Sequence, residues 1–389
     1  MLVLEDFPSY RTIEDMNSDR RDFLKQSLLA GAALAIKPSD LFSQATTTIS
    51  NNMELRFYPY TLELKHTFTI ATSSRTTTPT MMVEVERDGI IGYGEASMPP
   101  YLGESQETAK VFLSKVNLKR YELFFSLEVI LKDIDAIAMG NHAAKAAVDI
   151  ALHDWIGKKM GYAWYQIWGL TPDKTPVTSF TIGIDTKEVV RTKVKEADIY
   201  KVLKVKLGRE NDKEMIETIR EVTDKPIRVD VNQGWKDKTQ ALNMIEWLAT
   251  KGIEFVEQPM PKDQIDDLVW LKEKSPLPIV GDESITRLSD VRNAYGVYDG
   301  VNVKLMKCTG MREAHKMITL AKALEMKVML GCMTETSCAI SAATQLSPMA
   351  DWVDLDGAVL IKNDLFKGAT IVDGKMVMPK GPGIGVTKI

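Results

Sequence analysis

Acidic residues recur at regular intervals in the second half of this 389-residue sequence, each at the end of a short apolar segment. Asp230, Glu257 and Asp282 are separated by 27 and 25 positions. A single carboxylate after a strand is more often a helix cap than a metal ligand. Three carboxylates after successive strands favour metal binding over capping. Three converging carboxylates suit a hard divalent cation such as Mg²⁺, which prefers oxygen ligands. We therefore predict one Mg²⁺ ion per chain, held by these side chains.

Two lysines flank this acidic set. Lys206 precedes Asp230 by 24 positions, and Lys304 follows Asp282 by 22. On a ring of eight strands they would belong to the second and sixth strands and face one another across the mouth. One lysine could then remove a proton from one face of a carbon, and the other could return a proton to the opposite face.

A lysine that acts as a base near neutral pH needs a lowered pKa. Lys204 lies two positions before Lys206, so both side chains are expected on the same face of a strand. We predict that the like charge of Lys204, together with the nearby metal, lowers the pKa of Lys206. We therefore count Lys204 with Lys206 and Lys304 as catalytic.

Short apolar segments alternate with amphipathic helical stretches after Pro176. Eight strands separated by helices predict a (β/α)₈ TIM-type barrel, in which catalytic groups lie at the carboxyl ends of the strands. The expected strands are 177–181, 202–206, 227–230, 255–257, 279–281, 300–304, 327–330 and 352–355.

The preceding part of the chain has a different pattern. Segments 54–64 and 80–87 are rich in β-branched and aromatic residues, and a turn at Asp88-Gly89 leads into a third strand, which predicts a small antiparallel sheet. The Thr/Ser-rich segment 67–80 is expected to be a flexible loop, with Arg75 as its single charge.

Helical periodicity begins near Glu104 and ends with a helix capped at Asn141 that carries one apolar stripe. We expect an α+β domain over 46–170, a barrel over 171–365, and a C-terminal segment 366–389 that packs back on the first domain.

The bulk composition restricts the partners and the metal chemistry. A formal net charge of −4 gives no global basic field for nucleic acid or an anionic membrane. The chain has four histidines and three cysteines, without zinc-type or redox spacing. No apolar run reaches the roughly 18 residues of a membrane span. Metal chemistry is thus expected from carboxylates.

The first 45 residues are expected to be a targeting segment rather than part of the fold. Ser18 to Lys25 contains the pair Arg20-Arg21 and resembles a twin-arginine export signal, and the small apolar run 28–36 follows it. Cleavage before Thr46 would give a periplasmic or otherwise exported protein. The alternatives are a mobile basic tail on a cytoplasmic protein, and a true start at Met16.

These motifs together resemble the muconate-lactonizing subgroup of the enolase superfamily over about residues 54–389. The segments that carry the resemblance, in order and spacing, are Lys204-Val205-Lys206, Val229-Asp230-Val231-Asn232, Val256-Glu257-Gln258-Pro259, Gly281-Asp282-Glu283-Ser284 and Asn302-Val303-Lys304. The resemblance implies an α+β domain that caps the barrel mouth, an essential Mg²⁺ ion and an enediolate intermediate. It also implies that Lys206 and Lys304 are the acid/base pair.

The last strand indicates the substrate class. Asp354-Leu355-Asp356 resembles the Asp-x-Asp motif of dipeptide epimerases, whose two acids receive the substrate's ammonium group. Residues i and i+2 of a strand face the same side, so two carboxylates there would form an anionic pocket that favours an amine.

Three further residues are counted as substrate-binding. Thr181 matches a position that touches the dipeptide backbone in such epimerases. Glu335 ends a segment, Gly331 to Glu335, that fits the family's seventh strand. Arg75 is the cation available to meet an acidic side chain. The resemblance thus implies an L-Ala-D/L-Glu epimerase acting on a fragment of murein peptide. Lys204 is also expected to contact the substrate.

These motifs also allow other functions. Within the subgroup they are o-succinylbenzoate synthase, N-acylamino acid racemase and muconate cycloisomerase, whose substrates carry no ammonium for Asp354 and Asp356. An exported metal-binding or peptide-binding protein without catalysis is a different class, disfavoured because a pure binder gains little from two buried lysines. The expected partner is a small dipeptide, and we expect a homo-oligomer.

Overall fold

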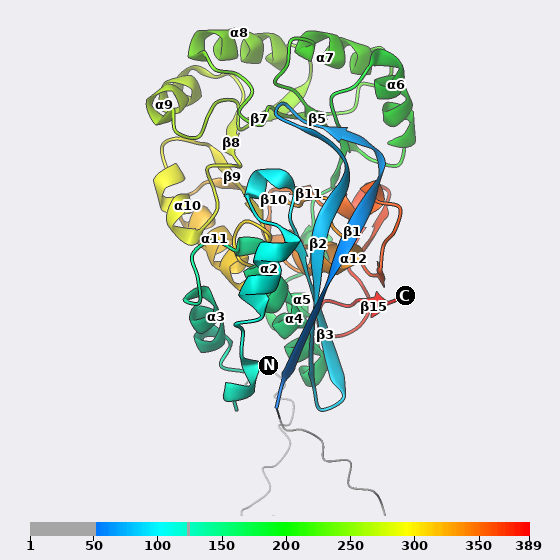
Figure 1. The fold of residues 1–389 in the computed structure, drawn as a ribbon. Coiled ribbons are helices and arrows are strands. Elements are labelled where there is room, and N and C mark those ends of the chain that lie inside the picture. Colours follow the sequence, from blue (N-terminus) through cyan, green and yellow to red (C-terminus); the bar gives the residue numbers. More distant parts are fainter. Residues whose placement is uncertain (1–51, 123–124) are drawn as a thin grey trace, which may run out of the picture. The chain divides into compact units, whose positions relative to one another are not determined.

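The computed structural model describes residues 52–122 and 125–389 (Figure 1). The targeting segment predicted over residues 1–45 therefore lies outside the described residues. The described chain forms a parallel barrel and an α+β cap domain that precedes it in sequence.

Eight parallel strands form the barrel in sequential order, so each strand pairs with the next one along the chain. The strands are β4 (Ser179–Ile182), β5 (Val202–Lys206), β6 (Ile227–Asp230), β7 (Ile253–Glu257), β8 (Ile279–Gly281), β9 (Gly300–Lys304), β10 (Lys327–Gly331) and β11 (Trp352–Asp354). A bridge between Thr178 and Val353 joins the first strand to the last. The predicted barrel is confirmed, and every predicted strand boundary lies within two residues of the observed one.

Helices return the chain from each strand to the start of the next (Figure 1). They are α6 (Lys187–Glu196), α7 (Asp212–Arg220), α8 (Lys238–Ala249), α9 (Ile265–Lys274), α10 (Leu288–Ala294), α11 (Met311–Ala323) and α12 (Ser337–Thr344), with the short turns η4 (Ser347–Met349) and η5 (Gly357–Leu360) around β11. Because parallel strands in such a barrel all point the same way, their carboxyl ends meet at one mouth.

The cap domain contains a three-stranded antiparallel sheet and a set of helices. Its elements are β1 (Glu54–Thr69), β2 (Ser74–Arg87), β3 (Ile90–Ser97), η1 (Pro100–Leu102), α2 (Gln106–Leu113), η2 (Leu118–Arg120), α3 (Leu127–Asp135), α4 (His142–Met160), α5 (Trp164–Ile167) and η3 (Pro172–Lys174). Gly92 and Gly94 allow α4 to lie directly on β3, because a Cβ atom at either position would meet backbone of α4 at 2.2 and 1.9 Å.

The segment 67–80 is not the flexible loop that the sequence suggested. Strands β1 and β2 extend through it as a long hairpin, with Phe68 opposite Arg75 and Thr69 opposite Ser74. The turn is closed by a hydrogen bond from Ile70 N to Ser73 O (2.9 Å). The Thr-rich composition favours this outcome, since β-branched threonine fits a pleated strand.

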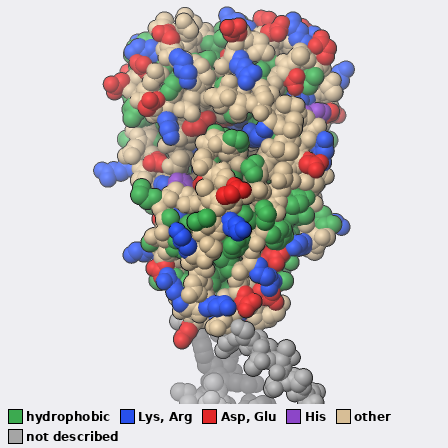
Figure 2. All heavy atoms as spheres, viewed as in Figure 1, with side chains coloured by type: hydrophobic (Ala, Val, Ile, Leu, Met, Phe, Trp, Pro, Cys, Tyr) green, Lys and Arg blue, Asp and Glu red, His purple; other side chains and the backbone are tan. Residues whose placement is uncertain are grey.

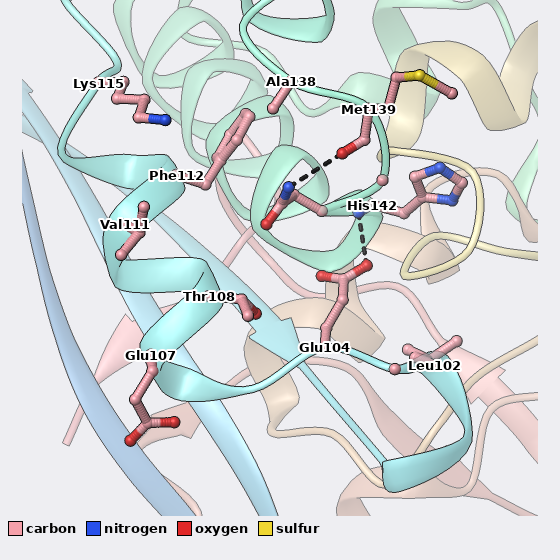
Figure 3. A pocket seen from close by; sticks show the side chains of 13 residues that line it. Leu102, Glu104, Glu107, Thr108, Val111, Phe112, Lys115, Ala138, Met139 and His142 are labelled. Carbon is pink, nitrogen blue, oxygen red and sulfur yellow. Dashed lines mark hydrogen bonds between the residues drawn. The ribbon is translucent and has the colours of Figure 1, made fainter.

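Helix α4 also differs from its prediction in two respects. Asn141 has a left-handed φ of 53° and makes no side-chain cap. The Glu104 carboxylate instead accepts hydrogen bonds from the backbone N atoms of His142 (2.6 Å) and Ala143 (3.2 Å) (Figure 3). The helix is also buried on nearly all sides rather than along one stripe, because it packs on β3 and against α11.

The C-terminal segment 366–389 contacts both domains, although the sequence suggested the cap alone. Its strands are β12 (Phe366–Lys367), β13 (Thr370–Val372), β14 (Lys375–Val377) and β15 (Thr387–Lys388). Phe366 packs edge-on against Tyr93 of the cap, and Ile384 N donates to Asp154 of α4 at 3.0 Å. The β13–β14 hairpin instead bridges to Val177, just before the first barrel strand.

Charges of both signs are interspersed over the face shown in Figure 2. No helix in residues 52–122 or 125–389 is long and apolar enough to cross a membrane. A charged substrate would therefore be recognised by groups inside the barrel mouth rather than by a field of one sign on this face.

Candidate active site

A small cavity of about 40 Å³ lies at the barrel mouth, beneath the β1–β2 hairpin. We call it the central cavity. It is lined by Phe68, Ile70, Arg75, Tyr101, Thr181, Lys204, Lys206, Asn232, Lys304, Cys332, Met333, Thr334, Asp354, Asp356 and Leu360. The structure thus brings together seven residues that the sequence singled out, from one strand of the cap and four strands or strand ends of the barrel.

The three acids at the ends of β6, β7 and β8 lie beside this cavity. One carboxylate oxygen from each of Asp230, Glu257 and Asp282 lies within 4.8 Å of the others, and all three side chains are buried. Burial and the neighbouring charge of Asp230 raise the pKa of Glu257 to about 7. Three carboxylates buried this close together repel one another, and a bound cation would relieve that repulsion.

The oxygen atoms of this group fit a hard divalent cation. Glu257 Oε1 accepts a hydrogen bond from Asn302 Nδ2 (2.7 Å), whereas Glu257 Oε2 is buried, makes no hydrogen bond among the described residues and has only the ion pair with Lys204 Nζ at 2.8 Å. Three buried carboxylates whose oxygens converge in this way are the donor set expected for Mg²⁺, which coordinates oxygen ligands and retains positions for water and substrate.

The backbone around these acids is held in an unusual conformation. Gln258 follows Glu257 with φ of 37°, and Asn232 follows Asp230 by two residues with φ of 46°. Non-glycine residues seldom adopt this left-handed region, and such conformations concentrate at functional sites. Gln258 Oε1 also accepts a hydrogen bond from Asp282 N (2.9 Å), which ties the second acid to the third. No local sequence pattern marked this supporting role of Gln258.

Lys206 and Lys304 project into the cavity from opposite sides of the barrel. They end β5 and β9, which are four strands apart in the order of eight. Lys206 Nζ donates to Asp230 Oδ2 at 2.5 Å, and Lys304 Nζ donates to Asp282 Oδ2 at 2.7 Å. A carbon atom between them would have one ammonium or amine group on each face.

Lys204 is surrounded by acids. Its Nζ atom lies 2.8 Å from Glu257 Oε2, 2.9 Å from Asp354 Oδ2 and 3.2 Å from Asp230 Oδ2. Burial lowers the pKa of Lys204, but these carboxylates outweigh burial and hold it well above its ordinary value. Lys204 is therefore a fixed cation on the same strand face as Lys206. Its effect on the pKa of Lys206 stays a prediction.

Asp354 and Asp356 both line the cavity, but they are not the two equivalent acids that the motif suggested. Asp354 is already compensated, because Ser179 Oγ donates to its Oδ1 (2.6 Å) and Lys204 to its Oδ2 (2.9 Å). Asp356 accepts a hydrogen bond from the backbone N of Thr181 at 2.6 Å and has no ion pair with a cation among the described residues. Burial and the charge of Asp354 raise the pKa of Asp356 to about 7. An incoming ammonium group would thus find its main partner in Asp356.

Arg75 lies inside the cavity rather than in a mobile loop. Its guanidinium stacks over Phe68 at 4.8 Å, and its Nε donates to Thr78 Oγ1 at 3.2 Å. Burial lowers the pKa of Arg75, and its Nη1 has no hydrogen-bond partner within the described chain. A buried donor without a partner is costly. An anionic group bound in the cavity would remove this cost.

Glu335 was predicted to bind substrate, but it does not line the central cavity. Its carboxylate accepts a hydrogen bond from Met333 N (2.9 Å), and it is not among the described residues that line the cavity. Burial raises its pKa to about 8, with a contribution from the nearby Glu95. The neighbouring Thr334 lines the cavity instead and hydrogen-bonds Thr78 of the cap at 2.7 Å. A strand-end position therefore did not predict which residue of this loop lines the cavity.

Two cap residues at this junction were not predicted. Tyr101, from η1, lines the cavity and donates its hydroxyl to Met333 Sδ (2.6 Å). Glu95, from β3, accepts hydrogen bonds from Thr336 N (3.0 Å) and Ala339 N (3.4 Å) at the start of α12, and burial raises its pKa to about 7. Neither lies at a barrel strand end, so no local pattern marked them.

Cys332 lines the cavity without any sign of reactivity. Burial raises the pKa of its thiol well above the ordinary value. A reactive cysteine needs an environment that favours the thiolate. Cys332 therefore contributes packing to the cavity wall.

Two family models match the chain. The mandelate racemase / muconate lactonizing enzyme N-terminal domain matches residues 53–169, and the enolase C-terminal domain-like model matches residues 186–388. The chain is 57% identical over 381 residues to an L-Ala-D/L-Glu epimerase of Bacteroides thetaiotaomicron, and this match covers 95% of the chain and all of the relative.

Solved structures of epimerases are also similar to this chain. A substrate-liganded complex of the L-Ala-D/L-Glu epimerase from Bacillus subtilis superimposes with a TM-score of 0.81 at 28% identity, over 87% of this chain and 99% of the other. A dipeptide epimerase from Cytophaga hutchinsonii, complexed with Mg and D-Ala-L-Val, gives a TM-score of 0.81 at 27% identity, over 87% and 96%. With its capped barrel, its acids at successive strand ends and these matches, the chain belongs to the mandelate racemase / muconate lactonizing enzyme family of the enolase superfamily.

Proposed function

We propose that this protein is a Mg²⁺-dependent dipeptide epimerase that inverts the α-carbon of the C-terminal residue, with L-Ala-D/L-Glu as its substrate. The observation that carries the proposal is the pair Lys206 and Lys304, set on opposite sides of a buried group of three carboxylates. The 57% identity to an L-Ala-D/L-Glu epimerase supports it. So do the solved dipeptide epimerases that contain Mg.

The three acids Asp230, Glu257 and Asp282 would hold the ion. When bound, Mg²⁺ neutralises charge on a substrate carboxylate and so acidifies the adjacent C–H bond. With an ion bound, Asp230 and Asp282 would no longer need Lys206 and Lys304 as their counter-charges. Each lysine could then reach the α-carbon from its own side.

Proton transfer in the two directions uses the lysines in turn. One lysine in its neutral form removes the α-proton from one face, while the other, protonated, delivers a proton to the opposite face. Lys204 stays cationic beside the carboxylates and favours the neutral form of whichever lysine acts as base. The result is inversion, with one proton taken up and one released.

Recognition of a dipeptide is assigned to other residues that line the central cavity. Asp356, supported by Asp354, would receive the N-terminal ammonium, and Thr181 beside Asp356 would contact the peptide backbone. Arg75 carries the buried donor without a partner, which suits the side-chain carboxylate of glutamate. Substrates of the other enzymes of the subgroup lack this ammonium, so the acid pair favours a dipeptide.

The proposal is tested by hydrogen exchange. Incubation with L-Ala-L-Glu and Mg²⁺ in D₂O should exchange the glutamate α-hydrogen and produce the D-epimer, as measured by mass spectrometry and chiral chromatography. Turnover of an N-acyl amino acid, with no exchange in any dipeptide, would contradict it.

Single lysine variants test the two opposed bases. Lys304→Ala should abolish epimerisation yet leave exchange of one glutamate enantiomer through Lys206, and Lys206→Ala should leave exchange of the other. The exposed Lys262→Ala, outside the cavity lining, is the matched control and should keep both activities. Equal loss of exchange for both enantiomers in each variant would rule out bases on opposite faces.

The cellular setting is also a proposal. The twin-arginine-like segment within residues 1–45 supports export to the periplasm, where murein peptides that carry L-Ala-D-Glu occur. Cell fractionation with and without Arg20-Arg21→Lys-Lys would test export. A homo-oligomer is likewise proposed, and light scattering would measure its size.

A further inference from the structure

A surface groove of about 580 Å³ runs along helix α2 of the cap domain (Figure 3). We call it the α2 groove. One wall is α2 itself, and the other is the turn from Ala138 to His142 that leads into α4. None of the described residues that line the α2 groove also lines the central cavity. The groove is therefore separate from the proposed site of catalysis.

The polar groups inside the α2 groove already have partners. The Glu104 carboxylate accepts a hydrogen bond from His142 N (2.6 Å), and Asn141 Nδ2 donates to Met139 O (3.2 Å) (Figure 3). No buried side-chain nitrogen or oxygen without a hydrogen-bond partner occurs among the described residues of the lining. The groove therefore lacks the convergent unpaired polar groups by which a small polar ligand is recognised.

Apolar side chains on both walls of the groove are open to solvent. Val111 of α2 is 57% exposed, and Met139 on the opposite wall is 97% exposed. Covering these side chains with another apolar surface would be favourable. Single exposed apolar residues are common, however, so their exposure does not identify what covers them.

The charges along α2 identify the occupant. Glu107 lies four residues before Val111 and Lys115 four residues after it, which is the spacing of one helix face. Helix α2 ends at Leu113, but the turn that follows keeps Lys115 on the groove. Neither Glu107 nor Lys115 forms an ion pair within the described part of the chain. The helix thus presents a negative, an apolar and a positive group in order, and the two charges lack partners.

This stripe is complementary to a reversed copy of itself. If two copies of α2 packed antiparallel about a two-fold axis at Val111, Glu107 of each chain would lie opposite Lys115 of the other. Glu107 and Lys115 are about 12 Å apart at 1.5 Å per residue in both copies, so the two ion pairs form together. Exposed ion pairs add little affinity, but they fix the orientation of two surfaces.

We infer that the α2 groove is an interface between two copies of this chain, related by a two-fold axis close to Val111. Val111 and Met139 supply the apolar contact, and the two Glu107–Lys115 pairs set the antiparallel orientation of the helices. The inference does not depend on the proposed epimerase activity. It gives the proposed homo-oligomer a specific contact surface.

A cysteine at the axis tests the symmetry. In Val111→Cys the new thiol would face its own copy, so oxidised glutathione should join the two chains by a disulfide and leave as two reduced molecules. Non-reducing electrophoresis should then show a product of twice the chain mass. Val372→Cys, at a position 61% exposed on β13 and outside the groove, is the matched control and should give no such product. The wild type controls for the three native cysteines.

Charge reversals test the two ion pairs. Glu107→Lys and Lys115→Glu each place like charges opposite one another and should raise the dissociation constant of the dimer roughly tenfold or more. The double variant Glu107→Lys/Lys115→Glu restores opposite charges and should return it to within about threefold of the wild type. Lys195→Glu, at an exposed position on α6 outside the groove, is the matched control. Light scattering over a concentration series measures these constants.

The oligomeric state decides the inference. A wild type that stays monomeric throughout the concentration series overturns it and leaves the groove to a different protein. An oligomer that both single reversals leave intact, and that Val111→Cys does not cross-link, overturns it as well, because its interface lies elsewhere. Cross-linking through position 111, together with rescue in the double variant, supports the inference. Neither readout uses catalysis, so the result bears on the interface and leaves the proposed function to its own test.

Discussion

Asp356 is the residue whose ionisation is most directly coupled to recognition. It is buried beside Asp354 and accepts a hydrogen bond from Thr181 N. Its pKa in the free protein is raised to about 7. At neutral pH it is therefore close to half protonated, and only its charged form attracts an ammonium group.

The pH dependence of kcat/KM should report this group. Because the pKa of Asp356 is raised, the charged form is lost as pH falls through about 7, so kcat/KM should fall between pH 8 and pH 6. Asp356→Asn should lower kcat/KM at pH 8 and remove this acidic limb. Measurements at saturating Mg²⁺ keep the metal ligands ionised. A variant that retained the same limb would assign it to another group.

Lys307 is a buried cation that the proposed chemistry does not use. Its Nζ donates to Asp282 O (2.5 Å), to Asn302 O (3.1 Å) and to the Asp282 carboxylate. Lys307→Met should lower the free energy of unfolding by about 3 kcal/mol in EDTA, because removal of this buried cation leaves Asp282 Oδ1 without its donor, while Lys304 still pairs with Oδ2. Urea unfolding measures this change. The exposed Lys262→Met should stay within about 0.5 kcal/mol of the wild type, and an equal loss in both variants would contradict the argument.

The β1–β2 hairpin is the element that controls access to the site. The central cavity of about 40 Å³ is far smaller than the roughly 300–1,000 Å³ of small-molecule sites. We therefore expect the hairpin to move when a dipeptide enters. The turn is held on the barrel by Arg209, whose Nη2 donates to Ile70 O (2.9 Å), and by Ile184 N, which donates to Thr69 O (3.0 Å).

Arg209→Ala should therefore weaken closure of the hairpin. Loss of a charged hydrogen bond of about 1.5 kcal/mol corresponds to roughly a tenfold rise in KM, with a smaller change in kcat. Hydrogen exchange of the backbone around residues 66–76 should increase in parallel. Arg191→Ala is the matched control, since Arg191 pairs with Glu221 and does not contact the hairpin. Unchanged exchange in the hairpin would show that Arg209 does not hold it.

At the scale of the whole molecule, the acidic group links metal binding to folding. Asp230, Glu257 and Asp282 come from three strands and meet only in the folded barrel. Mg²⁺ should therefore bind the folded state alone and stabilise it, by about 2.7 kcal/mol at a hundredfold excess over Kd. Thermal unfolding of EDTA-treated protein should shift upwards by a few degrees on titration with Mg²⁺. Asp230→Asn should blunt this shift, and a wild-type Tm that does not respond would contradict the metal assignment.

The order and spacing of the strand-end residues were determined by the sequence itself. Local patterns mark each strand and helix, and a parallel barrel brings all carboxyl ends of its strands to one mouth. The sequence alone therefore predicts that these side chains lie together: Lys206, Asp230, Glu257, Asp282 and Lys304. The barrel and its eight strand boundaries followed from the same periodicity.

Tertiary structure alone decided which side chains face the cavity and what they contact. Lys204 compensates Asp354 across 150 positions, Glu104 caps α4 from 38 positions away, and Tyr101 enters the cavity from the cap. Glu335 does not line the cavity, although it follows a strand as its neighbours do. Strand periodicity is a local property of the chain, whereas these contacts depend on the close approach of distant segments, which no pattern of a few residues records.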